Sequence, residues 1–274
     1  PSITLAANIT ADDIIDASEA GGPVAVTGTT TGARDGDVVT LTVNGTAFTG
    51  TVSGGAFSIN VTGAALTADA DLTIDASVLA TDAAGNSATA TDSETYTVDT
   101  TAPSVTVDIV DAALNVADTS SNVTFTFSEA PVGFVVGDVT VSGGTLSAFT
   151  ATADPLVYTA TFTATAGFEG SGSVSVGAGS YTDAAGNPGG AGGDTVAIDT
   201  SAPTPTITLA ANITADDIIN AIEAAGSVAV SGTVTGARDG DLVTLTVNGT
   251  AFTGTVSGGG FSINVTGAAL TADA

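Results

Sequence analysis

Apolar and polar residues alternate along much of the first hundred residues of the chain. Alternation with a period of two puts every second side chain on the same face of a β-strand, so it predicts strands that bury one face. Glycines and an Asn-Gly pair separate the alternating runs as turn signals. The pattern predicts seven strands, at residues 2–8, 24–31, 37–44, 46–52, 56–62, 72–81 and 87–98. In three of them the residues expected to face a core are Val39, Leu41 and Val43; Phe57, Ile59 and Val61; and Leu72, Ile74, Ala76 and Val78.

Seven short strands within about one hundred residues are typical of an immunoglobulin-like β-sandwich. The chain has no cysteine and no tryptophan, so it lacks the core that marks antibody domains, and the prediction rests on strand number. Similar strand patterns recur further along, for example at residues 123–127 and 158–163. We therefore expect an all-β chain of tandem immunoglobulin-like β-sandwiches in an extended linear array.

An internal repeat divides the chain. Residues 1–70 align without gaps on residues 205–274, and only nine of these 70 positions differ. The segment between them has another sequence but the same closing motifs. We expect an Ig-like repeat of type A at 1–102, one of type B at 103–203, and a second type A repeat at 204–274. This last repeat is incomplete because its sixth and seventh strands, the equivalents of 72–81 and 87–98, are missing. No signal peptide is visible at Pro1, and the chain is expected to be a segment of a longer protein.

The charge balance excludes several kinds of partner. The chain has 29 acidic residues, two arginines and no lysine, which gives a formal net charge of −27. Binding to nucleic-acid phosphates or to an anionic membrane surface is excluded by this charge. The acidic groups also repel one another in a compact state unless cations neutralise them.

The absent residue types exclude several kinds of site. Cysteine and histidine are both absent, which removes disulfides, structural zinc and catalysis by a thiol or a Ser–His pair. No apolar run approaches the 18 residues or so of a membrane-spanning helix. We therefore expect no direct membrane contact.

Two short acidic motifs recur at matching positions. The hexapeptide TDAAGN occurs at 81–86 and at 182–187, and each copy is followed by Asp-Thr-x-Ala-Pro, at 99–103 and at 199–203. The same residues therefore close two repeats that otherwise differ in sequence.

In an up-and-down order of seven strands, alternate loops fall at the same end of a sandwich. The linker residue Asp99 then arrives at the end of the second repeat that carries Asp183 and Glu129. Carboxylates with amide and carbonyl oxygens suit a hard cation with six to eight oxygen ligands, which is calcium, better than they suit magnesium. The candidate ligands are Asp99, Asp183, Asn187, Glu129, Asp138, Asp199, Asp82, Asn86, Asp12, Asp13, Asp16 and Glu19. The alternative is that acids crowd surface loops and that TDAAGN is only a favourable hairpin turn.

The same residues carry a resemblance to a known family. The stretches DVVTLTVNGTAFTGTV, DLTIDASVLATDAAGN and YTVDTTAP resemble the tandem Ig-like extender domains of giant bacterial RTX adhesins, the biofilm-forming and ice-binding surface proteins. The middle stretches SNVTFTFSEA, DVTVSGGTL and YTDAAGN resemble a second Ig-like repeat of such proteins. The resemblance implies a calcium-rigidified stalk that is exported by type I secretion and projects an adhesive domain from the cell.

The resulting hypothesis is a structural extender segment at the bacterial cell surface. Its partners would be the neighbouring repeats of the same chain, and the adhesive target would lie outside this segment. A self-assembling filament or surface-layer subunit and a ligand-binding Ig-like module remain alternatives. We do not expect an enzyme, because acid pairs such as Asp12 and Asp13 come without a cleft-building insertion or an aromatic platform.

Overall fold

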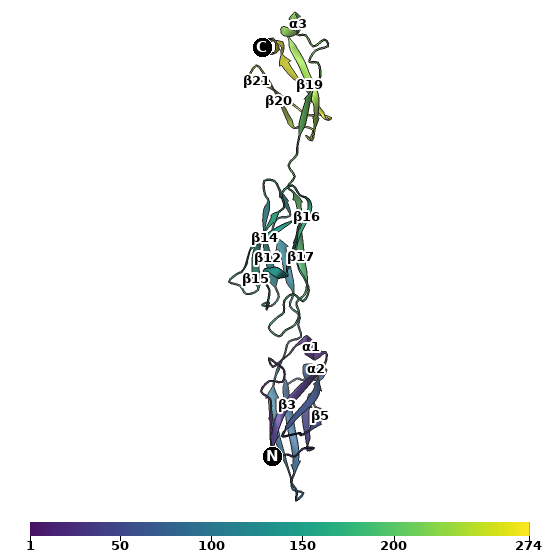
Figure 1. Ribbon diagram of the computed structural model, residues 1–274, viewed down its shortest axis with the longest axis vertical. Helices are drawn as coiled ribbons and strands as arrows, with labels where there is room; N and C mark the ends of the chain where they lie inside the picture. The colour runs from purple at the N-terminus through teal and green to yellow at the C-terminus, as the bar shows by residue number, and fades with distance from the viewer. Residues whose placement is uncertain (274) are drawn as a thin grey trace. The chain divides into compact units, whose positions relative to one another are not determined.

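The structure is a computed structural model, and it describes residues 1–273. The chain divides into two compact units, Pro1–Thr200 and a second unit that begins at Ser201. The first unit contains two β-sandwiches with separate hydrophobic cores, and the second unit contains a third core (Figure 1). The predicted fold class, all-β with Ig-like sandwiches, is therefore confirmed.

The first sandwich packs a three-stranded sheet against a four-stranded sheet. The first sheet has the order β1-β3-β6, and the second has the order β5-β4-β7-β8, all antiparallel. A short parallel pair, β2 and β9, closes one end. The strands are β1 (Ser2–Leu5), β2 (Ile14–Ile15), β3 (Pro23–Thr31), β4 (Val38–Val43), β5 (Thr46–Thr51), β6 (Ala56–Thr62), β7 (Thr73–Thr81), β8 (Ser87–Thr95) and β9 (Thr97–Val98).

The alternation places the core as predicted. Nine of the ten residues that the pattern assigns to the core are at most 5% exposed, and Leu72 is partly buried against the same cluster. Two of the predicted strands are too long. The first ends at Leu5 instead of residue 8, and the last is interrupted at Tyr96, whose backbone N–H donates to the Leu72 carbonyl at 3.1 Å.

Two short helices of the first sandwich are absent from the prediction. They are α1 (Ala17–Ala20) and α2 (Gly63–Thr67), which lie side by side in Figure 1. Asp16 and Glu19 form a reciprocal capping box at the start of α1, and the Asp-x-x-Glu spacing is a readable signal for it. Gly63 lets the two helices touch, because a Cβ at this position would lie 2.0 Å from the Glu19 carbonyl oxygen.

The second sandwich packs two four-stranded sheets, ordered β10-β12-β15-β14 and β11-β17-β16-β13. All pairs are antiparallel except β11 and β17. The elements are β10 (Val105–Ile109), β11 (Ala113–Asn115), β12 (Ser120–Phe127), the 3-10 helix η1 (Val136–Asp138), β13 (Val139–Ser142), β14 (Gly144–Ala151), β15 (Val157–Ala164), β16 (Glu169–Val176) and β17 (Gly192–Asp199).

Aromatic side chains fill the core of the second sandwich. Phe134 is 6% exposed and Tyr181 is 2% exposed, and they contact Phe127 edge-to-face with ring centroids 4.9 and 5.0 Å apart. Tyr96 of the first sandwich is also buried. Because Phe134, Tyr181 and Tyr96 are buried, they do not form a ligand-binding surface, which argues against the alternative of a ligand-binding module.

The second unit repeats part of the first sandwich. It has two sheets, β18-β19-β22 and β20-β21, and two short helices. Its elements are β18 (Thr206–Leu209), α3 (Ala221–Ala224), β19 (Ser227–Thr235), β20 (Leu242–Val247), β21 (Thr250–Thr255), β22 (Gly260–Thr266) and α4 (Gly267–Ala272). Up to residue 273 no strands equivalent to β7 and β8 accompany β20. Ile207 and Leu209 are therefore 52% and 53% exposed, whereas their equivalents Ile3 and Leu5 are buried.

One repeat difference tests the packing of the first sandwich. Thr30 is 6% exposed, and its hydroxyl is the only buried side-chain polar atom without a hydrogen-bond partner in residues 1–273. The equivalent residue of the second unit is Val234, which is also buried. Because an unpartnered buried hydroxyl is costly, Thr30→Val is expected to stabilise the first sandwich by about 1 kcal/mol.

Calorimetry of the full chain measures this effect as a rise in the melting temperature. The reverse exchange, Val234→Thr, is the matched control and should lower the stability of the second unit. A Thr30→Val chain that melts at or below the wild-type temperature would contradict the packing described for Thr30.

Candidate metal centre between the first two sandwiches

The linker that leaves the first sandwich is held to it by β9. The Asp99 backbone N–H, directly after β9, donates to the Ile15 carbonyl at 3.1 Å. The Asp99 carboxylate accepts a hydrogen bond from the Thr101 backbone N–H at 3.0 Å, which tightens the turn into Pro103. Proline fixes its own φ and keeps the residue before it extended. The Asp99 side chain therefore leaves the first sandwich at a defined point.

The β16–β17 connection of the second sandwich contains the second TDAAGN motif, which forms a closed turn. Asp183 and Asn187 are 3% and 1% exposed. The Asp183 carboxylate accepts from the backbone N–H of Asn187 and from its side-chain Nδ2, both at 2.8 Å. Gly186 has φ 93°, a conformation that glycine adopts without strain. The turn fixes the direction of the Asp183 carboxylate, and half of its lone pairs remain for other partners.

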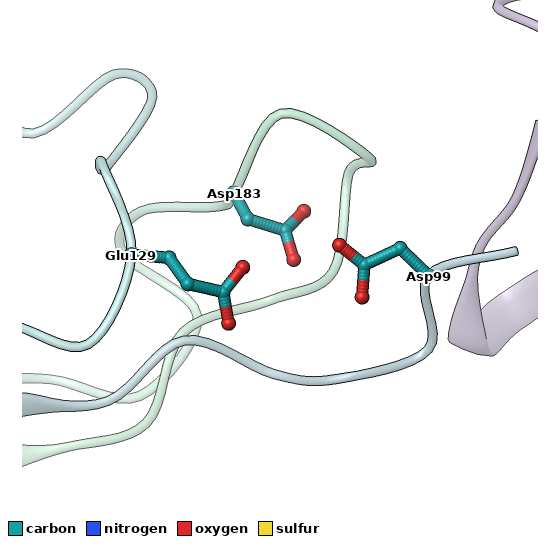
Figure 2. Close-up of side chains that lie close together, drawn as sticks. All are labelled: Asp99, Glu129 and Asp183. Atoms are coloured by element: carbon teal, nitrogen blue, oxygen red, sulfur yellow. The ribbon is translucent and has the colours of Figure 1, made fainter.

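Three carboxylates meet where the linker reaches this turn. One carboxylate oxygen from each of Asp99, Glu129 and Asp183 can be chosen so that all three lie within 4.8 Å of one another. Figure 2 shows the three side chains pointing toward one another from the linker and from two loops of the second sandwich. Asp99 and Glu129 are partly buried and Asp183 is buried.

Within the described first unit, residues 1–200, no salt bridge joins this cluster to a basic side chain. The two arginines are Arg34, in the loop between β3 and β4 of the first sandwich, and Arg238, in the second unit. Two like charges 4 Å apart repel by about 1 kcal/mol in water and by about 4 kcal/mol near a protein surface. A hard cation would remove this repulsion, and the donor set is made of oxygen atoms alone, which suits calcium or magnesium rather than a soft metal.

Asn187 contributes to the junction through hydrogen bonds. Its Oδ1 accepts from the backbone N–H of Ala17, the first residue of α1, at 2.7 Å. Its Nδ2 donates to the Asp99 carbonyl at 2.8 Å as well as to Asp183. The predicted role of Asn187 was a metal ligand, but here its amide oxygen faces α1 of the first sandwich instead of the carboxylates.

The first copy of the hexapeptide has the same internal bonds in a different setting. Asp82 accepts from the Asn86 backbone N–H at 2.8 Å and from Asn86 Nδ2 at 2.9 Å. These bonds, that from the Asn86 side chain first, lower the pKa of Asp82. Both residues are exposed, in the β7–β8 turn. The turn is therefore a property of the motif alone, and burial depends on the neighbouring sandwich.

The acidic side chains between β1 and β3 of the first sandwich accept hydrogen bonds from backbone N–H groups of the same segment. Asp12 accepts from the Ile14 N–H, and Asp13 accepts from the Ile9 N–H. Asp16 and Glu19 cap α1, and burial raises the pKa of Glu19, with further contributions from the charges of Asp16 and Asp12. These four residues lie at the end that meets the second sandwich, but outside the three-carboxylate cluster. Their ligand role stays a prediction.

Two further candidates also lie outside the cluster. Asp138 ends η1, and its carboxylate accepts from the Val135 N–H at 2.8 Å. Asp199 is the last residue of β17, just before the second unit. Of the twelve residues predicted from the sequence, the structure thus brings three carboxylates together and adds Asn187 beside them.

Comparisons with known proteins agree with this architecture. A family model described as a bacterial Ig-like domain matches residues 99–200. Among curated protein sequences none matches the chain. A solved structure of a Ca²⁺-stabilised adhesin, with which an Antarctic bacterium reaches out and binds ice, is 38% identical with a TM-score of 0.61. That match covers 99% of this chain and 67% of the other.

In the match to a second solved structure, a larger share of the other chain is covered. That structure belongs to a 1.5-MDa bacterial ice-binding adhesin, is 36% identical with a TM-score of 0.52, and is matched over 99% of this chain and 88% of its own. This chain belongs to the Ig-like extender repeats of large bacterial adhesins. It is a stalk segment of such an adhesin and is extracellular, at the bacterial cell surface. In residues 1–273 no helix of the adhesin segment is long and apolar enough to cross a membrane.

Proposed function

We propose that this adhesin segment is a structural extender in which calcium fixes the angle between the first two sandwiches. The observation that carries the proposal is the meeting of Asp99, Glu129 and Asp183 without a basic partner. Asp99 belongs to the linker after the first sandwich, and the other two belong to the second. A cation that binds all three would tie the two sandwiches at a second point besides the chain itself.

The requirement for such a tie follows from the size of contacts between domains. Neighbouring domains in one chain share small interfaces, so relative motion is expected unless something restrains it. The Asp-Thr-x-Ala-Pro linker restricts the hinge through its proline, which also holds the alanine before it extended, but it leaves the threonine dihedrals free. Calcium takes six to eight oxygens in flexible geometry, and carboxylates, loop carbonyls and water can supply them. Magnesium demands a tighter octahedron and holds its water more strongly.

The proposal extends to the organisation of the chain. We assign the repeats to residues 1–102, 103–203 and 204 onward, each with its own core. In this scheme the neighbouring repeats are the partners of each sandwich, and the segment has no catalytic role. The solved relative that is described as Ca²⁺-stabilised supports the choice of metal.

Removing one carboxylate tests the site. Asp183→Ala is expected to abolish calcium binding at the junction while the second sandwich stays folded, because the residue lies in a turn and its loss leaves no cavity in the hydrophobic core. Equilibrium dialysis with atomic absorption should show one calcium ion fewer per chain than in the wild type.

A charge-matched control separates the site from the overall charge. Asp108→Ala removes one carboxylate from the exposed face of β10 in the same sandwich and should leave the ion count unchanged. An Asp183→Ala chain that binds as many ions as the wild type, with the same affinities, would refute the assignment.

A further inference from the structure

The side-chain amide of Asn187 joins the two sandwiches directly. We propose that Asn187 is an ion-independent lock for this junction, and that its contact with Ala17 holds the calcium site in its binding geometry. The first half of the proposal needs no metal. The second half rests on the proposed function, because it concerns calcium affinity.

The side-chain amide makes three hydrogen bonds, which reach α1, the linker and the TDAAGN turn: Nδ2 donates both of its hydrogens, and Oδ1 accepts one. Oδ1 accepts from Ala17 in α1, and Nδ2 donates to the linker carbonyl of Asp99 and to the Asp183 carboxylate, at 2.7, 2.8 and 2.8 Å. Asn187 is 1% exposed. Buried hydrogen bonds are expensive to break without replacement, so separation of the sandwiches is opposed even without an ion.

The neighbouring contacts are consistent with a close fit at this point. The Asp16 carboxylate lies 3.4 Å from the position that a Cβ would take at Gly186, so the turn packs against the start of α1. The first TDAAGN turn, with Asn86, has the same internal bonds. What distinguishes Asn187 is its pair of bonds to α1 and to the linker.

A neutral amide suits this role because the surrounding groups are acidic. Asn187 holds Asp183 through two donors without adding charge to the three carboxylates. The same two bonds fix the direction of one predicted ligand, and the bond to the Asp99 carbonyl fixes the backbone that carries another. Closure of the lock thus prepares the calcium site. Loss of the lock should lower the apparent calcium affinity in proportion to the fraction of molecules in which the junction remains closed.

Ala17→Pro removes the lock from the side of the first sandwich. Ala17 is the first residue of α1, where proline is favoured, and Asp16 before it is already extended, with φ −83° and ψ 177°. The substitution deletes the N–H that Asn187 accepts from, and the proline ring occupies its place. Ala221→Pro at the first residue of α3, after the equally extended Asn220, is the matched control.

The first readout is the distance distribution between the two sandwiches in chelator. Because the chain has no native cysteine, nitroxide labels can be attached at Ser58→Cys and Ser147→Cys, both exposed. Pulsed dipolar spectroscopy in chelator should give a narrower distribution for the wild type and for Ala221→Pro than for Ala17→Pro, and calcium should narrow the wild-type distribution further. A wild-type distribution in chelator that Ala17→Pro leaves unchanged would overturn the lock.

The second readout is calcium affinity by titration calorimetry. If the closed fraction falls to about one fifth, Ala17→Pro should bind calcium about fivefold more weakly, although it removes no ligand. An unchanged affinity would overturn the preparation of the site by the lock. If no calcium binds even to the wild type, the proposed function fails, while the chelator experiment still decides the lock.

Variants on both sides of the Ala17–Asn187 contact show whether a broader distance distribution comes from loss of this contact or from loss of folding. Asn187→Ala should broaden the distribution as Ala17→Pro does, and the double variant should add little, because both remove the same contact. Asn86→Ala, the same residue in the exposed copy of the hexapeptide, should have no effect on the distance. Additive effects of Ala17→Pro and Asn187→Ala would contradict a shared contact.

Discussion

Saturating calcium is expected to raise the melting temperature of the first two sandwiches well above that measured in chelator. An ion that binds only the folded state adds about 2.7 kcal/mol per site at 100 times its dissociation constant. For a domain of about 100 residues each kcal/mol shifts the melting temperature by about 4–8 °C, so a rise of more than 10 °C is expected if one sandwich gains the full effect. Calorimetry in millimolar calcium and in chelator measures it, and magnesium should produce a smaller rise.

Two controls separate the ion at the junction from a general effect of salt. The chain carries a net charge of −27, so any salt screens its repulsion, and sodium chloride at the same ionic strength gives the size of that screening. Asp183→Ala should lose most of the calcium-specific rise and keep the screening effect. Equal melting temperatures in calcium and in matched sodium chloride would contradict a bound ion.

Asp69→Ala is expected to destabilise the first sandwich by about 3 kcal/mol. Asp69 is 6% exposed and accepts from the backbone N–H groups of Asn44 and Thr73, each at 3.1 Å, and from the Tyr96 hydroxyl at 3.0 Å. Removing the carboxylate leaves the two backbone N–H groups without their charged partner, while the Tyr96 hydroxyl keeps the Leu66 carbonyl, at 2.8 Å. Burial, and then the bond to Asp69, raise the pKa of Tyr96, which keeps the hydroxyl protonated and able to donate.

Hydrogen–deuterium exchange of the backbone amides in β7 and β8 measures this loss of stability in the first sandwich alone. A local measurement is needed because the two sandwiches have separate hydrophobic cores. Asp71→Ala, two residues away and exposed, is the control and should have little effect. Asp69→Asn keeps the shape and should cost less than Asp69→Ala. If Asp69→Ala and Asp71→Ala exchange at the same rate, the buried network around Tyr96 does not support the sandwich as described.

The strands could be predicted because their signal is local. Alternation between buried and exposed side chains located Val39, Ile59 and Val78 in the core without knowledge of which strands pair. The helices α1 and α2 are four and five residues long, too short for a helical period to be read. The capping box of Asp16 and Glu19 was the available signal for α1.

The candidate site could be predicted in composition but not in detail. The recurrence of an Asp in the hexapeptide and in the linker pointed to Asp183 and Asp99, and loop order added Glu129. Which atoms of Asn187 face which neighbour depends on the fit of two sandwiches, and no spacing in the sequence encodes that. For the same reason Asp69 carried no signal, since the hydroxyl that contacts it comes from Tyr96, 27 residues away.

Anomalous diffraction from crystals grown in calcium tests most directly whether calcium binds among Asp99, Glu129 and Asp183, as we propose. Data collected at a wavelength where calcium scatters anomalously should give a peak in contact with all three carboxylates, with oxygen ligands at about 2.3–2.6 Å. Crystals of Asp183→Ala grown in the same solution should lack that peak. A wild-type map with no peak at this junction, from crystals in saturating calcium, would contradict the account.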